Sequence, residues 1–128
     1  MYYDASILLV DDYKFIRTIL ERMLQQLGYQ NFCMAADGVE ALNLLRFQPV
    51  DLVITDYHMP EMEGISLFQS MQQDPALAKI PVLLISGVPT EKFVTQALAM
   101  GIQSTLTKPF RAEQLDQEIQ SLLTRSLS

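Results

Sequence analysis

Short apolar runs alternate with amphipathic helical patterns along this chain, and that alternation limits its fold more than any other feature. Residues 7–10, 52–54 and 82–85 are continuously apolar, which is typical of strands buried on both faces of a sheet. Residues 16–27 instead carry apolar side chains at helical spacing, and Gly28 follows them as a natural helix end. Strand and helix therefore alternate from the start of the chain.

The rest of the chain continues this alternation. Weaker strand patterns occur near residues 32–36 and 104–107. Asp37 and Glu40 have the spacing of a helix-capping box, which predicts a helix from there to about Phe47. Further helices are predicted through Phe68 and Met71, from Thr90 to Gly101, and through Leu115, Ile119, Leu122 and Leu123.

Five strand–helix units with short connections predict an α/β fold, in which helices cover both faces of a parallel sheet. Right-handed crossovers favour a flavodoxin-like (βα)5 doubly wound sandwich with the five-stranded order 2-1-3-4-5. The length suits one domain over residues 1–128, with its core at about 6–123.

Composition excludes several classes of function. No apolar stretch approaches the ~20 residues of a membrane span, and the N-terminus lacks a signal-peptide pattern, so we expect a cytoplasmic protein without membrane contact. The net charge is −6 and the nine basic residues are scattered, which argues against nucleic-acid binding. Cys33 is the only cysteine, and we expect it to be a small buried apolar residue rather than a redox group.

Each predicted strand except the second ends in a polar group that could take part in chemistry. Asp11 and Asp12 follow the first strand, Asp56 the third, Ser86 the fourth and Lys108 the fifth. Ligands of open parallel sheets bind at the carboxyl ends of the strands. The pattern therefore predicts a site for a hard cation and a phosphoryl group.

The chemistry of these groups is consistent with that prediction. Three neighbouring carboxylates resist ionising together, and a divalent cation removes the conflict. We expect Mg²⁺, with Mn²⁺ as the alternative, because Mg²⁺ prefers oxygen ligands and often joins carboxylates to phosphate. Asp56 could act as a nucleophile and form an aspartyl-phosphate. Taken singly, Asp12 could be a helix cap and Lys108 a surface lysine, but their joint placement favours the functional interpretation.

At these residues the chain resembles the receiver domain of two-component response regulators, and among them the stand-alone chemotaxis-type regulators. The resemblance covers about residues 6–123. The matching pieces are Val10-Asp11-Asp12, residues 37–42, Asp56 with residues 59–64, Ser86-Gly87, Ala97 with Gly101, and Lys108-Pro109-Phe110. Their order along the chain is far more specific than any single piece.

The resemblance implies a role for each site residue. Asp56 would accept a phosphoryl group from the phosphohistidine of a sensor histidine kinase or a phosphotransfer protein. Asp12 and Asp56 would hold Mg²⁺ directly, Asp11 through water, and His58 through its backbone carbonyl. We expect the His58 side chain to lie at the rim of the site and to modulate water access.

The remaining implied features concern the phosphoryl group and the output. Ser86 would follow the phosphoryl group and Lys108 would pair with it, next to a cis Lys108–Pro109 bond. A protein target would bind the face made by the fourth helix, fifth strand and fifth helix, where Phe93 and Met100 belong either to a partner-facing patch or to the core.

One position departs from the family pattern. The family usually has an aromatic residue three positions before the lysine, where this chain has Thr105. A threonine cannot fill an aromatic-sized space, so we expect phosphorylation to signal mainly through Ser86 and residues 87–90 into the following helix. The expected function is that of a regulator, with at most self-phosphorylation from small donors and slow self-dephosphorylation.

Three alternatives to a phosphoacceptor stay open at this point. A phosphate-independent interaction module would explain Thr105 but not the complete acidic site. An aspartate-nucleophile phosphohydrolase would want a second carboxylate where His58 stands. A flavodoxin would need a hydroxyl- and glycine-rich phosphate loop, where residues 11–14 read Asp-Asp-Tyr-Lys.

Overall fold

The computed structural model describes residues 2–57, 64–87, 95, 97–102 and 104–127. Its elements are β1 (Ser6–Val10), α1 (Lys14–Leu27), β2 (Asn31–Ala35), α2 (Gly38–Phe47), β3 (Leu52–Asp56), α3 (Gly64–Gln72), β4 (Val82–Ser86), β5 (Ser104–Thr107) and α5 (Ala112–Leu127). Between β4 and β5, residues 95 and 97–99 are also helical, inside the range where a helix is predicted. The expected helix start at Thr90 and Phe93 both lie outside the described residues.

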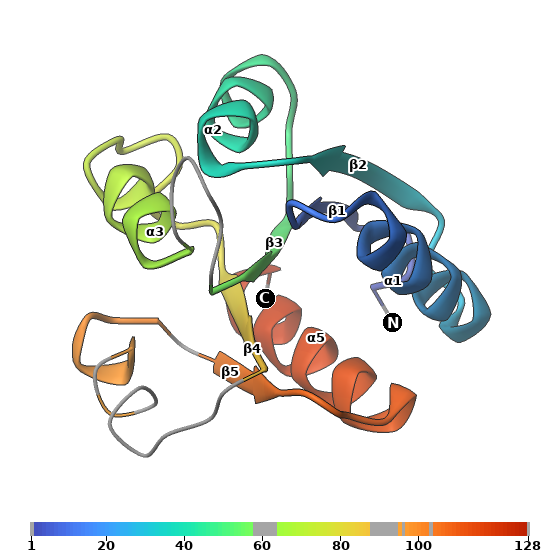
Figure 1. The fold of residues 1–128 in the computed structure, drawn as a ribbon. Coiled ribbons are helices and arrows are strands. Elements are labelled where there is room, and N and C mark those ends of the chain that lie inside the picture. Colours follow the sequence, from blue (N-terminus) through green and yellow to red (C-terminus); the bar gives the residue numbers. More distant parts are fainter. Residues whose placement is uncertain (1, 58–63, 88–94, 96, 103, 128) are drawn as a thin grey trace.

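The five strands form one parallel sheet of order β2-β1-β3-β4-β5, which confirms the predicted fold (Figure 1). The register aligns the carboxyl ends of neighbouring strands. Asp56 pairs with Ile85, and Ser86 pairs with Thr107. The side chains that follow these positions therefore meet at one edge of the sheet.

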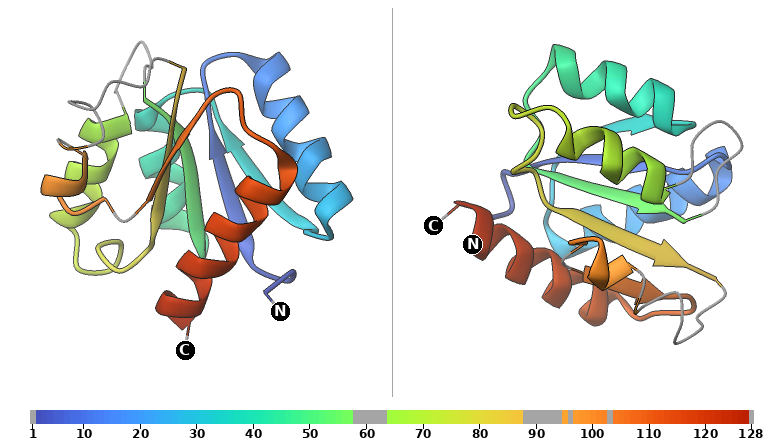
Figure 2. Two further views of the ribbon diagram at one scale, coloured as in Figure 1. Left: turned by 90° about the horizontal axis from the view of Figure 1, so that it is seen from below. Right: turned by 90° about the vertical axis from the view of Figure 1, so that its left-hand side faces the viewer.

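Helices cover both faces of the sheet, as Figures 1 and 2 show, with α1 and α5 on one face and α2 and α3 on the other. Each face has its own apolar core. The core under α2 and α3 includes Leu8, Val10, Val53, Leu67, Met71 and Leu84. The core under α1 and α5 includes Ile7, Leu9, Leu24, Ile54, Leu83, Leu115 and Ile119. Because successive side chains of a strand point to opposite faces, burial of both faces explains the consecutive apolar residues 7–10, 52–54 and 82–85 in β1, β3 and β4.

Helix ends follow the local chemistry read from the sequence. Gly28 ends α1 in the left-handed region at φ 111°, which glycine adopts without steric cost. The backbone N–H of Glu40 donates to Asp37 Oδ1 over 2.8 Å, and the Ala36 N–H donates to Glu40 Oε2 over 3.3 Å. The first bond confirms Asp37 as the cap of α2, while the second reaches the N–H one residue before the cap. One helical position differs from expectation, because Ile19 is 41% exposed rather than buried.

Cys33 is half-buried in β2 and packs against the core on the α2 side. Burial raises the pKa of its thiol, which disfavours the reactive thiolate. Within the described part of the chain, no helix is long and apolar enough to cross a membrane.

Candidate functional site

Three carboxylates meet at the carboxyl edge of the sheet. Asp11 and Asp12 follow β1, and Asp56 is the last residue of β3. One oxygen of each lies within 4.8 Å of the other two. Asp11 is buried, while Asp12 and Asp56 are half-buried, so the cluster opens to solvent on one side. The structure therefore brings together the three acids that the sequence predicts as one group.

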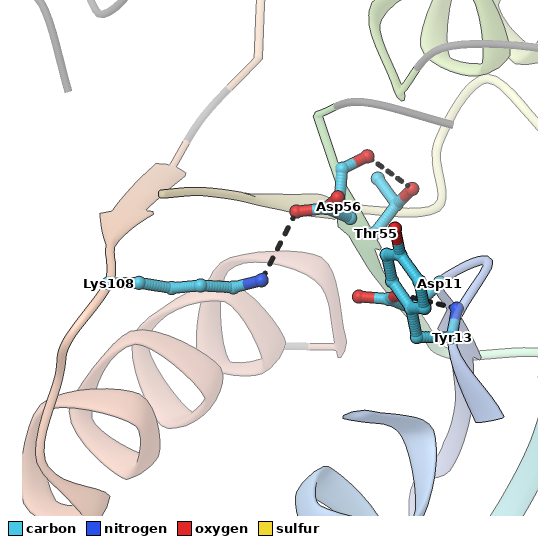
Figure 3. Close-up of polar contacts among 5 residues, drawn as sticks. All are labelled: Asp11, Tyr13, Thr55, Asp56 and Lys108. Atoms are coloured by element: carbon cyan, nitrogen blue, oxygen red, sulfur yellow. Dashed lines mark hydrogen bonds and ion pairs between the residues drawn. The ribbon is translucent and has the colours of Figure 1, made fainter. Parts of the chain in front are cut away.

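Backbone contacts fix Asp11 in this cluster. The Tyr13 N–H donates to Asp11 Oδ1 over 2.9 Å (Figure 3). The Asp11 N–H donates to the Ala35 carbonyl over 3.2 Å, and the guanidinium of Arg17 donates to the Asp11 carbonyl. Sequence reasoning gave no role to Tyr13 or Arg17, because neither carries an unusual pattern of its own.

Asp12 does not cap the first helix, so the simple structural alternative for this residue is wrong. The N-cap of α1 is Tyr13, and no side chain makes the capping hydrogen bond. Instead Asp12 Oδ1 is buried and has no hydrogen-bond partner among the described residues. A buried carboxylate oxygen without a donor is costly unless a cation or another donor satisfies it.

The electrostatics of the cluster follow from this crowding. Burial raises the pKa of Asp11, and repulsion from Asp56 and Asp12 adds to the rise. The Tyr13 N–H and the Lys108 cation lower this pKa in part. The cluster is therefore short of positive charge, although Lys108 already contributes one.

Lys108 reaches the cluster from the end of β5. Its Nζ lies 3.5 Å from Asp56 Oδ1, as Figure 3 shows, and the lysine side chain is 36% exposed. The Lys108 N–H donates to the Ser86 carbonyl over 2.9 Å, which continues the pairing of β4 and β5. The Lys108–Pro109 bond is cis, as the resemblance implies.

Ser86 ends β4 at the same edge and is 1% exposed. Gly87 follows it and is exposed. His58 lies outside the described residues, and so does the loop of residues 88–90 through which we expect activation to pass. Met100 is described and half-buried, which places it fully in neither the core nor the surface.

Gly64 is a further site residue whose role the sequence did not reveal, although it lies in the matching stretch 59–64. A Cβ there would lie 2.5 Å from the Asp56 carbonyl oxygen and 2.6 Å from Leu84 Cδ1. The Gly64 N–H also donates to the Tyr57 carbonyl over 3.0 Å. The start of α3 therefore packs directly against the backbone of Asp56, an approach that only glycine permits.

The donor set fits Mg²⁺. Among the described residues it offers three carboxylates, one with a buried oxygen that lacks a donor, and no nitrogen or sulfur ligand. Mg²⁺ prefers this all-oxygen set, and one or two carboxylates with a phosphate are its usual partners. Receiver domains bind Mg²⁺ at an acidic pocket of this kind.

Known proteins resemble the chain over almost its whole length. Residues 7–120 match the family described as response regulator receiver domain. Chemotaxis protein CheY-3 of Vibrio cholerae is 34% identical over 122 residues, covering 95% of this chain and 94% of the relative. Chemotaxis protein CheY of Pseudomonas aeruginosa is 34% identical over 120 residues, covering 94% of this chain and 97% of the relative.

A solved structure agrees with these relatives. The receiver domain of a sensor histidine kinase from Pseudomonas aeruginosa superposes with a TM-score of 0.84 at 26% identity, covering 94% of this chain and 98% of that one. That structure is described with a magnesium ion coordinated in the active site cleft. The fold, the acidic edge and these similarities agree, and the chain belongs to the response regulator receiver domain family.

Proposed function

We propose that this chain is a phosphoacceptor signalling module, a single receiver domain over residues 1–128 that switches a protein partner. Asp56 receives a phosphoryl group from the phosphohistidine of a sensor histidine kinase or a phosphotransfer protein, in a Mg²⁺-dependent reaction. The observation that carries the proposal is the placement of Asp56 at a strand end, beside Asp11 and Asp12 and 3.5 Å from the Lys108 ammonium. The cytoplasmic location expected from the sequence is part of this proposal.

The reaction is a transfer between two nucleophiles. A carboxylate oxygen of Asp56 attacks the phosphorus of the phosphohistidine, a P–O bond forms, the P–N bond breaks, and the imidazole leaves with its electron pair. Little covalent chemistry is required of the protein, so positioning and charge neutralisation carry the rate. Lys108 pairs with the phosphoryl oxygens, and the Ser86 hydroxyl donates a hydrogen bond to them.

Asp11, Asp12 and Asp56 would hold the metal, together with the backbone carbonyl of His58. When bound, Mg²⁺ offsets the negative charge of the carboxylates and of the incoming phosphoryl group. The unpartnered Oδ1 of Asp12 supports this assignment, because a metal would satisfy it. The raised pKa of Asp11 supports it as well, since burial and the neighbouring carboxylates both disfavour its negative charge, which a bound cation would offset.

Thr105 shapes how the phosphorylated state is transmitted. It is half-buried in β5 and pairs with Leu84 of β4, on the sheet face covered by α3. A threonine side chain has no aromatic ring, so it cannot make the inward ring rotation that the usual aromatic residue would make at this position. We therefore place the signal in Ser86 and residues 87–90, which pass it to the helix that follows. The protein target binds the face made by that helix, β5 and α5.

Intact-mass analysis tests the acceptor. Wild type, Asp56→Asn and the control Asp37→Asn are exposed to acetyl phosphate with Mg²⁺. Asp37→Asn removes one carboxylate but keeps a good helix cap, because asparagine caps as well as aspartate does. A single phosphoryl mass increment is expected in wild type and in the control, and none in Asp56→Asn or after chelation of the metal.

The same experiment separates the second candidate, a phosphate-independent interaction module. The observation in its favour is Thr105, which removes the usual aromatic. If wild type gains no phosphoryl group while calorimetry detects Mg²⁺ binding, the acceptor proposal fails and the interaction module is favoured. A mass increment that survives in Asp56→Asn would instead assign the acceptor to another residue.

A further inference from the structure

A second concave site lies at the edge of the sheet opposite the carboxylates. It is a cavity of about 370 Å³ between α3, the loop that leads into β4, and the C-terminal end of α5. In the left view of Figure 2, that loop and the end of α5 both lie at the base of the molecule. The volume is at the lower end of the range for small-molecule sites.

The inner wall of this cavity is apolar. Phe68 of α3, together with Pro81 and Val82 at the start of β4, lines it. All three are buried in the fold, and Val82 is only 1% exposed. The aromatic and aliphatic atoms of this wall are what the apolar part of a ligand would contact.

The mouth of the cavity is cationic. Lys79 and Arg125 both line it, and both are exposed. None of the described residues that line it is acidic. Across the described residues, neither cation forms an ion pair. In a chain with a net charge of −6, two cations at the mouth of one cavity, neither of them in an ion pair among the described residues, form an unusual local environment.

The loop that carries Lys79 is held in shape by its own hydrogen bonds. The Leu77 and Ala78 N–H groups donate to the Asp74 carbonyl, each over 2.9 Å, and Gln72 Nε2 donates to the Ala78 carbonyl over 3.1 Å. A wall fixed in this way loses little entropy when a ligand binds.

We propose that this cavity binds a small organic anion with an apolar body, which packs against Phe68 and Val82 while its carboxylate or phosphate pairs with Lys79 and Arg125. Arginine suits this role because its planar guanidinium matches both anionic groups bidentately. The cavity is separate in space from Asp56, since Val82 begins β4 and the phosphoryl site lies beyond its end.

Amide NMR titration with benzoate tests the proposal, with neutral benzamide as the isosteric control. Benzoate should shift the amides of Gln72, Lys79 and Val82 saturably, with a Kd in the millimolar range typical of a fragment. Benzamide should bind at least about tenfold more weakly. A parallel titration with phenyl phosphate decides whether a carboxylate or a phosphate is preferred.

Two double variants test whether benzoate affinity depends on the two cations at the cavity mouth. Lys79→Gln with Arg125→Gln should weaken benzoate binding roughly tenfold, at a few-fold for each exposed cation. Lys14→Gln with Arg22→Gln removes the same charge from the exposed side of α1 and should leave the affinity unchanged. Asp56→Asn should also bind benzoate normally, so a failed phosphoacceptor proposal would not affect this one.

Three results would overturn the proposal. Equal affinity for benzoate and benzamide would mean an apolar pocket without anion selectivity. Equal losses in the two double variants would mean a general effect of net charge. Absence of saturable shifts at Gln72, Lys79 and Val82 would mean that no such site exists.

Discussion

Gly64→Ala should destabilise the protein because the added methyl group has no space. Its carbon would lie 2.5 Å from the Asp56 carbonyl oxygen and 2.6 Å from Leu84 Cδ1, whereas ordinary contacts begin at 3.4 Å. Leu84 is fully buried and the oxygen belongs to the backbone, so α3 and β3 must move apart by almost an ångström. Overpacking of this kind lowers the free energy of unfolding by about 1–3 kcal/mol. The better helix propensity of alanine offsets less than about 1 kcal/mol of that loss.

Gly87→Ala is the matched control for this prediction. Gly87 also follows a strand at the site, but a Cβ there would meet nothing nearer than Lys108 Cδ at 4.0 Å. It should stabilise slightly, by about 0.4–1 kcal/mol, because alanine restricts the unfolded chain.

Urea unfolding measures both free energies, and a thermal midpoint should fall by about 4 °C for each kcal/mol lost. Transfer from acetyl phosphate should slow in Gly64→Ala alone, because the Asp56 backbone is displaced. If the two variants were equally stable, the close packing of α3 against Asp56 could not be the reason for glycine at position 64.

Three further predictions concern other contacts. Burial and the adjacent Asp116 carboxylate raise the pKa of Tyr29 above its ordinary value, so its contribution to stability should be complete below pH 10.0 and decline as the pH rises further. Phenolate absorbance should show one tyrosine that ionises at a higher pH than the others, and Tyr29→Phe should cost about 1–2 kcal/mol of unfolding free energy. Asp12→Asn should stabilise the metal-free protein by up to about 1 kcal/mol through reduced repulsion, and should abolish the rise in thermal midpoint that Mg²⁺ produces in wild type. Ser104→Ala should cost about 1 kcal/mol in urea unfolding because Glu118 loses its donor, whereas Glu118→Gln should cost less, since the amide oxygen still accepts.

The sheet could be predicted because its evidence is local and repeated. Apolar runs buried on both faces are typical of parallel sheets covered by helices, and right-handed crossovers then restrict the order of the strands. The strand ends place Asp11, Asp12, Asp56, Ser86 and Lys108 at one edge without any knowledge of side-chain conformations. Their roles in phosphoryl transfer stay predictions until Asp56 is modified directly.

Features that depend on how closely two elements pack could not be predicted from the sequence. Nothing in the sequence says that the Cβ of residue 64 would collide with the carbonyl of Asp56, because that distance depends on how α3 packs against β3. The cavity could not be predicted from the sequence for a similar reason. Lys79 and Arg125 are far apart in the sequence, and each alone is an ordinary surface cation.

The two sites lie at opposite ends of β4, and the strand itself is a poor route between them. Every residue of β4 is buried, and the strand pairs with β3 on one side and β5 on the other, so it has little freedom to shift. The described contact that bears on the cavity wall is at Gly101, which lines the cavity. A Cβ at Gly101 would lie 3.7 Å from Phe68 Cζ, so a shift of Gly101 would alter the packing of the ring that lines the cavity wall. We therefore expect benzoate affinity to change on phosphorylation of Asp56. By linkage, the equilibrium free energy of phosphorylation should change by the same amount when benzoate is bound. Titration of the phosphorylated protein measures this coupling, and identical affinities in the two states would contradict it.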